Sequence, residues 1–190
     1  MQLLEDRVRN EGKILPGEIV RVDGFLNHRV DTALMRELAK EFKKHFDLNG
    51  VTMILTAEAS GIALATVCAL EYGLPMAFAK KAKSDNIEGG LYCSDVHSYT
   101  YRKNTTFILA KEWLKPTDCV LIIDDFMARG QAIHGLLDIV GQSGAELRGI
   151  GIAVEKGFQG GGDDLRAKGY DLHSLVIIDS IEDGQFRFRK

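Results

Sequence analysis

The stretch VLIIDDFMARGQA, residues 120–132, decides the fold. Four apolar residues typical of a buried strand lead directly into Asp124 and Asp125. A short turn containing Gly130 then opens a segment with the apolar spacing of a helix. A strand that turns tightly into a helix is half of a βαβ unit, from which open parallel sheets are built. In such sheets ligands bind beyond the carboxyl ends of the strands, which is where the two aspartates stand.

Other apolar runs rich in β-branched residues predict the remaining strands, and helical patterns lie between several of them. Counting the opening stretch from Cys119, the predicted strands are 51–56, 75–79, 105–110, 119–124, 148–154 and 175–178. Helices are predicted after Asp31, a suitable N-cap, and over Gly61–Tyr72 and 130–141. We therefore expect an α/β fold with an open, mostly parallel sheet flanked by helices.

The chain has 190 residues, 45% of them hydrophobic, which suffices for the core of one domain. Because no repeat or linker divides the sequence, we expect a single domain over 1–190. Residues 80–103 are polar and irregular, with Gly89 and Gly90 in the middle. Loops of this length in a compact domain are usually functional lids or disordered, so we expect a flexible lid here, with Ser98 and Tyr99 near the reacting centre.

Composition argues against several classes of protein. The formal net charge of −3 gives no electrostatic basis for nucleic acid as a partner. The sequence shows no apolar run of about 20 residues that could span a bilayer and no signal peptide at its start. Three cysteines lie far apart without a C-x-x-C pair, and five histidines show no metal spacing. We therefore expect a globular protein of the reducing cytoplasm, with no membrane partner.

The aspartate pair suggests a particular ligand. Two carboxylates at the end of a buried strand are costly unless they meet hydrogen-bond donors or a cation. The turn that follows leads into a helix N-terminus, where free backbone N–H groups favour a phosphate, and Gly130 lets the backbone approach it closely. Carboxylates can accept hydrogen bonds from hydroxyl groups. Their position beside a phosphate-binding turn indicates a ribose phosphate as the ligand. The alternative is an ordinary βα unit in which Asp124 and Asp125 cap the next helix.

The stretch 120–132 resembles the loop of type I phosphoribosyltransferases that binds 5-phosphoribosyl 1-pyrophosphate (PRPP). The resemblance covers nearly the whole chain. Within that family, the sequence resembles the bacterial xanthine branch. Its further motifs are GFLNH (24–28), EASGIALA (58–65), the GQA turn with HGLLDIV, and GIAVEKGFQ (151–159). It implies the type I phosphoribosyltransferase fold and an enzyme, a pentosyl-transferring glycosyltransferase of purine salvage.

The resemblance also implies roles for the phosphate-binding residues. Asp124 and Asp125 would accept hydrogen bonds from the ribose hydroxyls and stabilise positive charge at the reacting carbon. The 5′-phosphate cradle would be formed by Ala128, Arg129, Gly130, Gln131 and Ala132. Arg129 and Ala132 replace the Thr or Ser of most family members, so two hydroxyl donors are missing, but backbone amides can still form the cradle. The pyrophosphate loop would be Glu58, Ala59, Ser60 and Gly61, with a plain N-cap as the alternative for Ser60.

A base-binding site is implied by residues outside these loops. Residues 1–30, which precede the sheet, would contribute to a hood over the base. Xanthine would be bound by Val20, an apolar lining residue, and by Asn27 and Lys156, which would meet its two oxygens. Phe158 is a candidate for stacking on the base or for the core, and Asn27 could instead be a turn asparagine. Lys80 stands where an arginine is common in the family.

These implications give one principal function and two alternatives. The principal one is transfer of the 5-phosphoribosyl group from PRPP to xanthine, giving xanthosine monophosphate (XMP) and pyrophosphate. The alternatives are a guanine or hypoxanthine phosphoribosyltransferase and, in another class, a PRPP-sensing transcription regulator of the same fold. We expect Mg²⁺ bound mainly through PRPP and pyrophosphate, with no dedicated protein ligands. The family further implies a homodimer.

Overall fold

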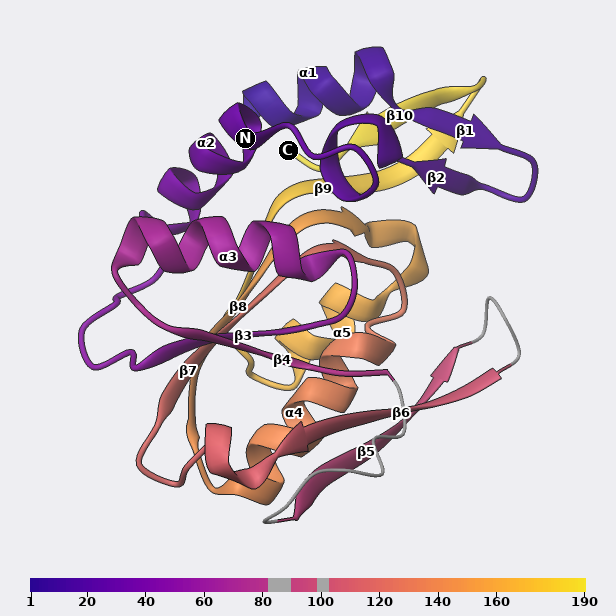
Figure 1. Cartoon of the computed structure of the whole chain (residues 1–190). Helices are drawn as coiled ribbons and strands as arrows, with labels where there is room; N and C mark the ends of the chain where they lie inside the picture. The colour runs from indigo at the N-terminus through magenta and orange to yellow at the C-terminus, as the bar shows by residue number, and fades with distance from the viewer. Residues whose placement is uncertain (82–89, 99–102) are drawn as a thin grey trace.

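A six-stranded sheet lies at the centre of the molecule, in the order β10-β9-β8-β7-β3-β4 (Figure 1). The computed structural model describes residues 1–81, 90–98 and 103–190. The sheet strands are β3 (Met53–Ala57), β4 (Met76–Ala79), β7 (Cys119–Met127), β8 (Glu146–Lys156), β9 (Leu172–Glu182) and β10 (Gln185–Phe188). Neighbouring strands run parallel, except that β10 is antiparallel to β9. The predicted open, mostly parallel sheet is confirmed.

The strand β7 is buried on both of its faces. Leu121 and Ile123 belong to the hydrophobic core on one side of the sheet, and Val120 and Ile122 to the core on the other. Successive side chains of a strand point to opposite faces, so an unbroken apolar run supplies both cores at once. This explains why the run shows no alternation, and it places the carboxyl end of β7 in the middle of the sheet.

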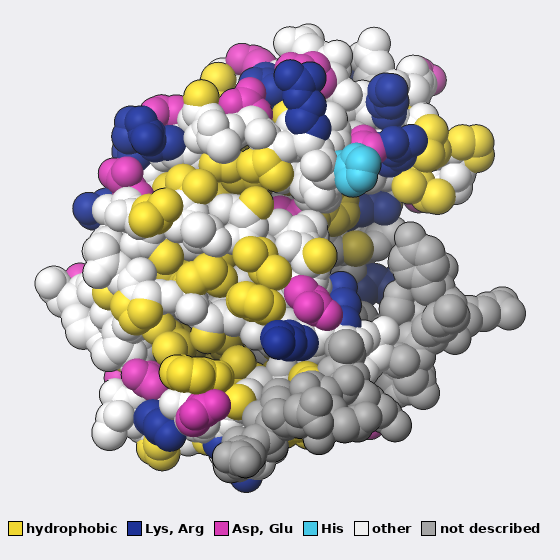
Figure 2. Space-filling view, in the orientation of Figure 1, with side chains coloured by type: hydrophobic (Ala, Val, Ile, Leu, Met, Phe, Trp, Pro, Cys, Tyr) yellow, Lys and Arg dark blue, Asp and Glu magenta, His cyan; other side chains and the backbone are white. Residues whose placement is uncertain are grey.

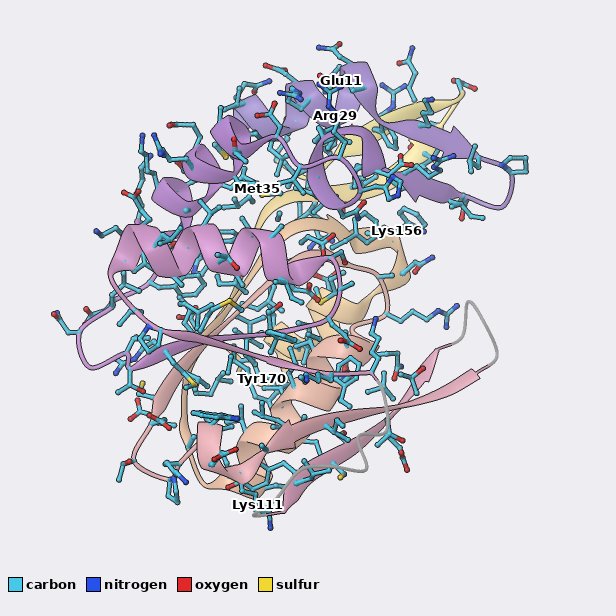
Figure 3. All side chains as sticks on the ribbon, viewed as in Figure 1. Glu11, Arg29, Met35, Lys111, Lys156 and Tyr170 are labelled. Carbon is cyan, nitrogen blue, oxygen red and sulfur yellow. The ribbon has the colours of Figure 1, made fainter. Side chains whose placement is uncertain are left out.

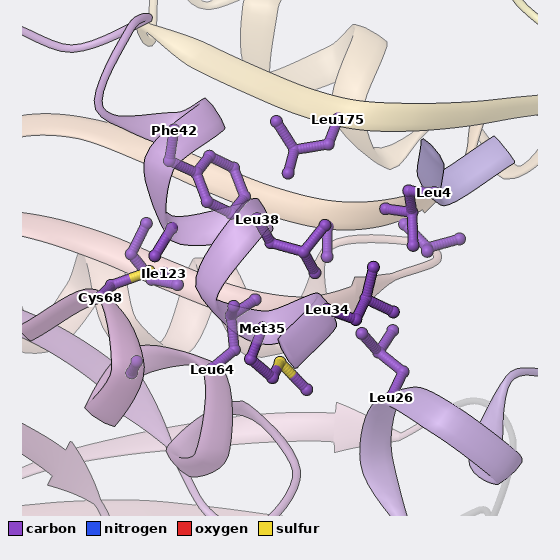
Figure 4. Close-up of a cluster of buried hydrophobic side chains, with 14 of the residues drawn as sticks. Leu4, Leu26, Leu34, Met35, Leu38, Phe42, Leu64, Cys68, Ile123 and Leu175 are labelled. Carbon is purple, nitrogen blue, oxygen red and sulfur yellow. The ribbon is translucent and has the colours of Figure 1, made fainter. Parts of the chain in front are cut away.

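Helices cover both faces of the sheet (Figure 1). They are α2 (Thr32–Phe42) and α3 (Gly61–Tyr72) on one face, and α4 (Gln131–Ser143) and α5 (Gly161–Ala167) on the other. Figure 4 shows Leu38 and Phe42 of α2 packed near Cys68 of α3 and Ile123 of the sheet. The predicted N-cap of α2 is confirmed, because the Asp31 carboxylate accepts hydrogen bonds from two backbone N–H groups at 3.1 Å each.

The first part of the chain packs over the carboxyl end of the sheet (Figure 1). It comprises α1 (Gln2–Glu11), the antiparallel pair β1 (Lys13–Leu15) and β2 (Ile19–Arg21), and the π-helical turn η1 (Asp23–Asn27). Leu4 and Val8 of α1 are fully buried in the same core as Phe186 of β10. The amino group of Met1 donates a hydrogen bond to the Leu175 carbonyl at 2.7 Å. The start and the end of the chain are thus joined in one layer.

The prediction of an irregular loop over 80–103 is wrong for its second half. Leu91–Ser98 forms β5, which pairs antiparallel with β6 (Lys103–Ala110) in a separate two-stranded sheet. The predicted strand 105–110 therefore exists, but it lies outside the central sheet. Tyr92, Ser94 and Val96 are buried in alternation, which is the pattern of a strand with one covered face. Residues 82–89 and 99–102, including Gly89 and Tyr99, lie outside the described residues.

Short helical turns complete the described structure. They are η2 (Lys111–Trp113) and η3 (Gly157–Gln159). The bounds of α3 agree with the prediction, whereas β7 and β8 continue three and two residues past their predicted ends. Within the described residues, none of the helices combines the length and the apolar character needed to cross a membrane.

Candidate active site at the carboxyl edge of the sheet

The aspartate pair stands in the second half of β7. The side chains of Asp124 and Asp125 are 6% and 1% exposed, respectively. The first residue of α4 is Gln131, and its N-cap position is occupied by Gly130 rather than by either aspartate. The alternative in which the pair caps this helix is therefore wrong. Two buried carboxylates that serve no helix need another partner, which is the first mark of a ligand site.

The charged form of the Asp124 carboxyl group is disfavoured by its surroundings. Its Oδ1 accepts a hydrogen bond from the Asp125 backbone N–H at 3.0 Å. Burial, followed by the negative charge of Asp125, raises the pKa of Asp124 well above the usual range of a carboxyl group. The hydroxyl of the buried Thr56 has no hydrogen-bond partner among the described residues. A cation or a hydroxyl-bearing ligand would satisfy both groups.

Gly61 lets the pyrophosphate-loop candidate lie against this pair. A Cβ at Gly61 would come within 2.5 Å of Asp124 Oδ1 and 2.3 Å of Thr56 Oγ1, so no larger residue fits without a shift. Glu58 accepts a hydrogen bond from the backbone N–H of Lys81. Ser60 occupies the N-cap position of α3, but its side chain makes no capping hydrogen bond in the described structure. The peptide bond between Glu58 and Ala59 is cis.

Asn27 links the N-terminal segment to the aspartates. Its side-chain Nδ2 donates a hydrogen bond to Asp125 Oδ2 at 2.9 Å, across 98 residues of sequence. Asn27 is the last residue of the turn η1. The contact means that Asn27 is not merely a turn asparagine, because its side chain reaches the centre of the site.

The turn after β7 has the backbone of an anion site. It comprises Ala128, Arg129 and Gly130, and it leads into Gln131 and Ala132 at the start of α4. Gly130 has a φ of 76°, a left-handed conformation that favours glycine. Within the described structure no side chain caps this helix, and the first N–H groups of a helix have no partner inside it, so those of α4 could bind an anion.

The opposite end of the site is formed by the end of β8. Lys156 Nζ donates a hydrogen bond to the Glu18 carbonyl at 2.9 Å and lies 4.9 Å from the centre of the Phe158 ring. Figure 3 shows Lys156 between the N-terminal segment and the turn that follows β8. Burial lowers the pKa of Lys156. Val20 and Phe158 are half-buried and pack against the core beneath this segment.

The structure thus brings the predicted residues to one edge of the sheet. Asp125 contacts Asn27, Asp124 adjoins Gly61, and Lys156 reaches the β1–β2 connection. The described residues contain no group of three or more His, Cys, Asp or Glu side chains placed to hold a metal. Sequence reasoning missed Thr56 and the Glu18 carbonyl. A threonine within a buried strand was the available signal for the first, but nothing in the sequence indicated the second.

Comparisons with known proteins agree with this geometry. The chain is 50% identical to a xanthine phosphoribosyltransferase of Lachnoclostridium phytofermentans over 191 residues, covering 100% of this chain and 98% of that protein. It is 48% identical to a xanthine phosphoribosyltransferase of Bifidobacterium longum over 192 residues, covering both chains completely. No family model matches the chain.

Solved structures share the fold. An adenine phosphoribosyltransferase of Giardia lamblia, complexed with 9-deazaadenine, superposes with a TM-score of 0.78 at 20% identity, over 93% of this chain and 98% of that one. One from Trypanosoma brucei, in complex with AMP, pyrophosphate and ribose-5-phosphate, gives 0.73 at 20% identity, over 92% and 79%. The fold is therefore that of the type I phosphoribosyltransferases. Within that class, the chain belongs to the xanthine phosphoribosyltransferase family, and the prediction of a glycosyl-transferring enzyme is confirmed.

Proposed function

We propose that this protein transfers the 5-phosphoribosyl group of PRPP to xanthine, giving XMP and pyrophosphate. One observation carries the proposal. A buried aspartate pair is followed by a backbone turn suited to a phosphate, and two side-chain N–H donors, the Asn27 amide and the Lys156 ammonium group, come to the same edge of the sheet. Ribose hydroxyls need acceptors, the phosphate needs backbone N–H groups, and a dioxopurine needs two donors. The turn, the aspartates and the two donors would meet these three requirements.

The aspartates would act on the reacting carbon. A ring nitrogen of the base bonds to C1 of the ribose, the bond from C1 to a pyrophosphate oxygen breaks, and the base loses one proton. Positive charge develops at C1 in the transition state, and the charges of Asp124 and Asp125 stabilise it where water is excluded. Removing one such group typically costs about 10²- to 10³-fold in turnover.

Base selection would rest on Asn27 and Lys156. Lys156 meets the oxygen that xanthine, guanine and hypoxanthine share, with Phe158 beside it and Val20 lining the same side. Asn27 donates to the second oxygen, which hypoxanthine lacks. Its contact with Asp125 supports this role, because it holds the amide at the boundary between ribose and base. Residues 1–30 would form the hood over the base.

Mg²⁺ fits the residues at this site. The buried Asp124 has a raised pKa and offers oxygen atoms, the ligands that Mg²⁺ prefers. Asp124 and Asp125 would approach it through its bound water, while PRPP and pyrophosphate provide most of its ligands. When bound, the ion would neutralise the charge of the leaving pyrophosphate. The 5′-phosphate would bind the backbone of 128–132, and the pyrophosphate would bind that of 58–61.

A second copy of the chain is the proposed partner of the face around β4. Figure 2 shows apolar side chains gathered over α3 and this edge of the sheet. A hollow of about 370 Å³ is lined there by Met53, Pro75, Met76 and Trp113, and the Trp113 side chain is 60% exposed. β4 ends the sheet, and a two-fold pairing would cover the same patch on both copies.

The function is tested by incubating the protein with PRPP, Mg²⁺ and xanthine. XMP and pyrophosphate should form in equal amounts, and chelation of Mg²⁺ should stop the reaction. Asp125→Asn, which keeps the shape of the side chain, should lower kcat by about 10²-fold or more. Product formation by the variant at the rate of the wild type would remove the pair from the mechanism.

A further inference from the structure

A buried ion pair holds α5 to the sheet, outside the groups assigned to the substrates. Glu155 of β8 is fully buried. Arg166 of α5 donates to both of its carboxylate oxygens, from Nη2 at 2.6 Å and from Nη1 at 3.1 Å. Ser174 of β9 donates a third hydrogen bond to the same carboxylate. A carboxylate met by two guanidinium N–H groups is fixed in direction as well as position.

The beginning of α5 lies against the back of the phosphate turn. A Cβ at Gly161, the first residue of α5, would come within 2.5 Å of the Ala128 carbonyl oxygen and 2.7 Å of the Gly130 nitrogen. These neighbours are backbone atoms, so a side chain at 161 could be accommodated only by moving the turn or the helix. Gly162 adjoins Glu155 in the same way, with a Cβ position 2.1 Å from Oε1. The helix is therefore wedged between the ion pair and the turn.

Further ion pairs hold the first turn of α5, and they are made by Arg189 near the C-terminus of the chain. Arg189 donates to the Asp163 carboxylate at 2.6 and 3.0 Å and to Asp179 of β9 at 2.9 Å. Arg166 Nη1 also contacts Asp163 at 3.1 Å. Two arginines thus converge on the first turn of α5. This end of the helix is held more firmly than the packing of seven residues alone would provide.

We propose that Glu155 and Arg166 are positioning residues for the 5′-phosphate turn. They fix α5 so that Gly161 sets the position of the backbone at 128–130, whose N–H groups bind the phosphate. The inference rests on the proposed function, because it takes this turn to be the phosphate subsite. Backbone donors cannot change rotamer to follow a displaced ligand, so their alignment depends on what lies behind them. Glu155 also precedes Lys156, so one short segment fixes both ends of the nucleotide.

Ribose 5-phosphate is the probe that tests the inference, because it has the phosphate but neither pyrophosphate nor base. Gly161→Ala should weaken its binding, measured by calorimetry on the full chain, by roughly tenfold or more. The KM for PRPP should rise by a similar factor, while the KM for xanthine stays within about twofold. Gly141→Ala is the matched control, since its Cβ would meet nothing within 4 Å. Its binding of ribose 5-phosphate should equal that of the wild type.

Arg166→Lys provides a second variant if Gly161→Ala does not fold. It keeps the charge but loses the paired donors, so binding of ribose 5-phosphate should weaken by roughly threefold to tenfold without a change in the KM for xanthine. The inference is overturned if both variants bind ribose 5-phosphate as the wild type does. It is equally overturned if the KM values for PRPP and xanthine rise together. Failure of the wild type to bind ribose 5-phosphate would instead refute the proposed function.

Discussion

Asp124 is a site residue that lowers the stability of the folded protein when its carboxyl group is ionised. Its carboxylate is buried beside a second carboxylate, and its pKa is raised by both effects. The folded protein therefore holds the Asp124 proton more tightly than the unfolded chain does. Stability from this group is fully present below the unfolded pKa of about 3.9 and is lost as the pH rises through the folded pKa.

Asp124→Asn should therefore make the protein more stable at neutral pH while lowering turnover by roughly 10²- to 10³-fold. The asparagine oxygen can still accept the backbone hydrogen bond, and one of the two buried charges is removed. Chemical denaturation from pH 4 to pH 8 checks the sign: the stability gain should grow as the pH rises. A gain that is constant with pH, or a loss at pH 7, would contradict the raised pKa.

The side-chain amide of Asn27 contacts Asp125, and this contact could not be foreseen from GFLNH alone. Asn27→Ala should lower kcat/KM for xanthine roughly 5- to 150-fold, equivalent to about 1–3 kcal/mol, because a donor to a buried oxygen is lost. It also removes a partner of Asp125, so part of the loss should be shared with hypoxanthine. The ratio of xanthine to hypoxanthine kcat/KM isolates the base contact, and it should fall.

Lys156→Ala is the matched comparison for Asn27→Ala. It removes a charged donor from an oxygen that all three oxopurines carry, so their kcat/KM values should fall together. If Asn27→Ala left the xanthine to hypoxanthine ratio unchanged, Asn27 would serve only to hold Asp125.

The β5–β6 hairpin shows where prediction fails for whole elements. Its second strand was predicted, but its first was hidden in a polar segment whose apolar residues cover only one face. A polar strand pairs outside the central sheet because its other face remains in water. By contrast, β7 and α3 were predicted closely, since continuous apolar runs and a glycine stop after Tyr72 allow few alternatives.

The hairpin is anchored to α4 by a close contact at Gly135. A Cβ there would lie 2.5 Å from the Val96 side chain and 3.0 Å from that of Phe107, which is 1% exposed. Phe107→Ala should cost about 3–5 kcal/mol if the hairpin and the core unfold together. If the hairpin opens alone, hydrogen exchange should speed up in β5 and β6 before it does in β7. Unchanged exchange in both strands would contradict the anchoring role.

In the molecule as a whole, the position of the site could be predicted from the sequence, but the contacts between distant segments around it could not. The aspartates, the phosphate turn and Lys156 follow apolar strands, so the rule for parallel sheets brings them to one edge. The contacts of Met1 with Leu175 and of Arg189 with Asp163 join distant parts of the chain. Such long-range contacts leave no periodic pattern in the sequence.

The exposed face around β4 gives a prediction about assembly. Trp113→Glu should shift a dimer toward the monomer in sedimentation experiments, because a buried charge would lie at the centre of the interface. Leu3→Glu is the control, since Leu3 is an exposed apolar residue on α1, away from this face. Equal sedimentation of Trp113→Glu and the wild type would place the second copy elsewhere or exclude it.

The central claim is that one site joins PRPP to a purine with two oxygens. The most direct measurement is kcat/KM for xanthine, guanine, hypoxanthine and adenine, each with PRPP and Mg²⁺. We expect xanthine to be the best substrate, by roughly tenfold or more over hypoxanthine, and adenine to be the poorest, because it offers Lys156 no oxygen. Equal values for xanthine and hypoxanthine, or a preference for adenine, would contradict it.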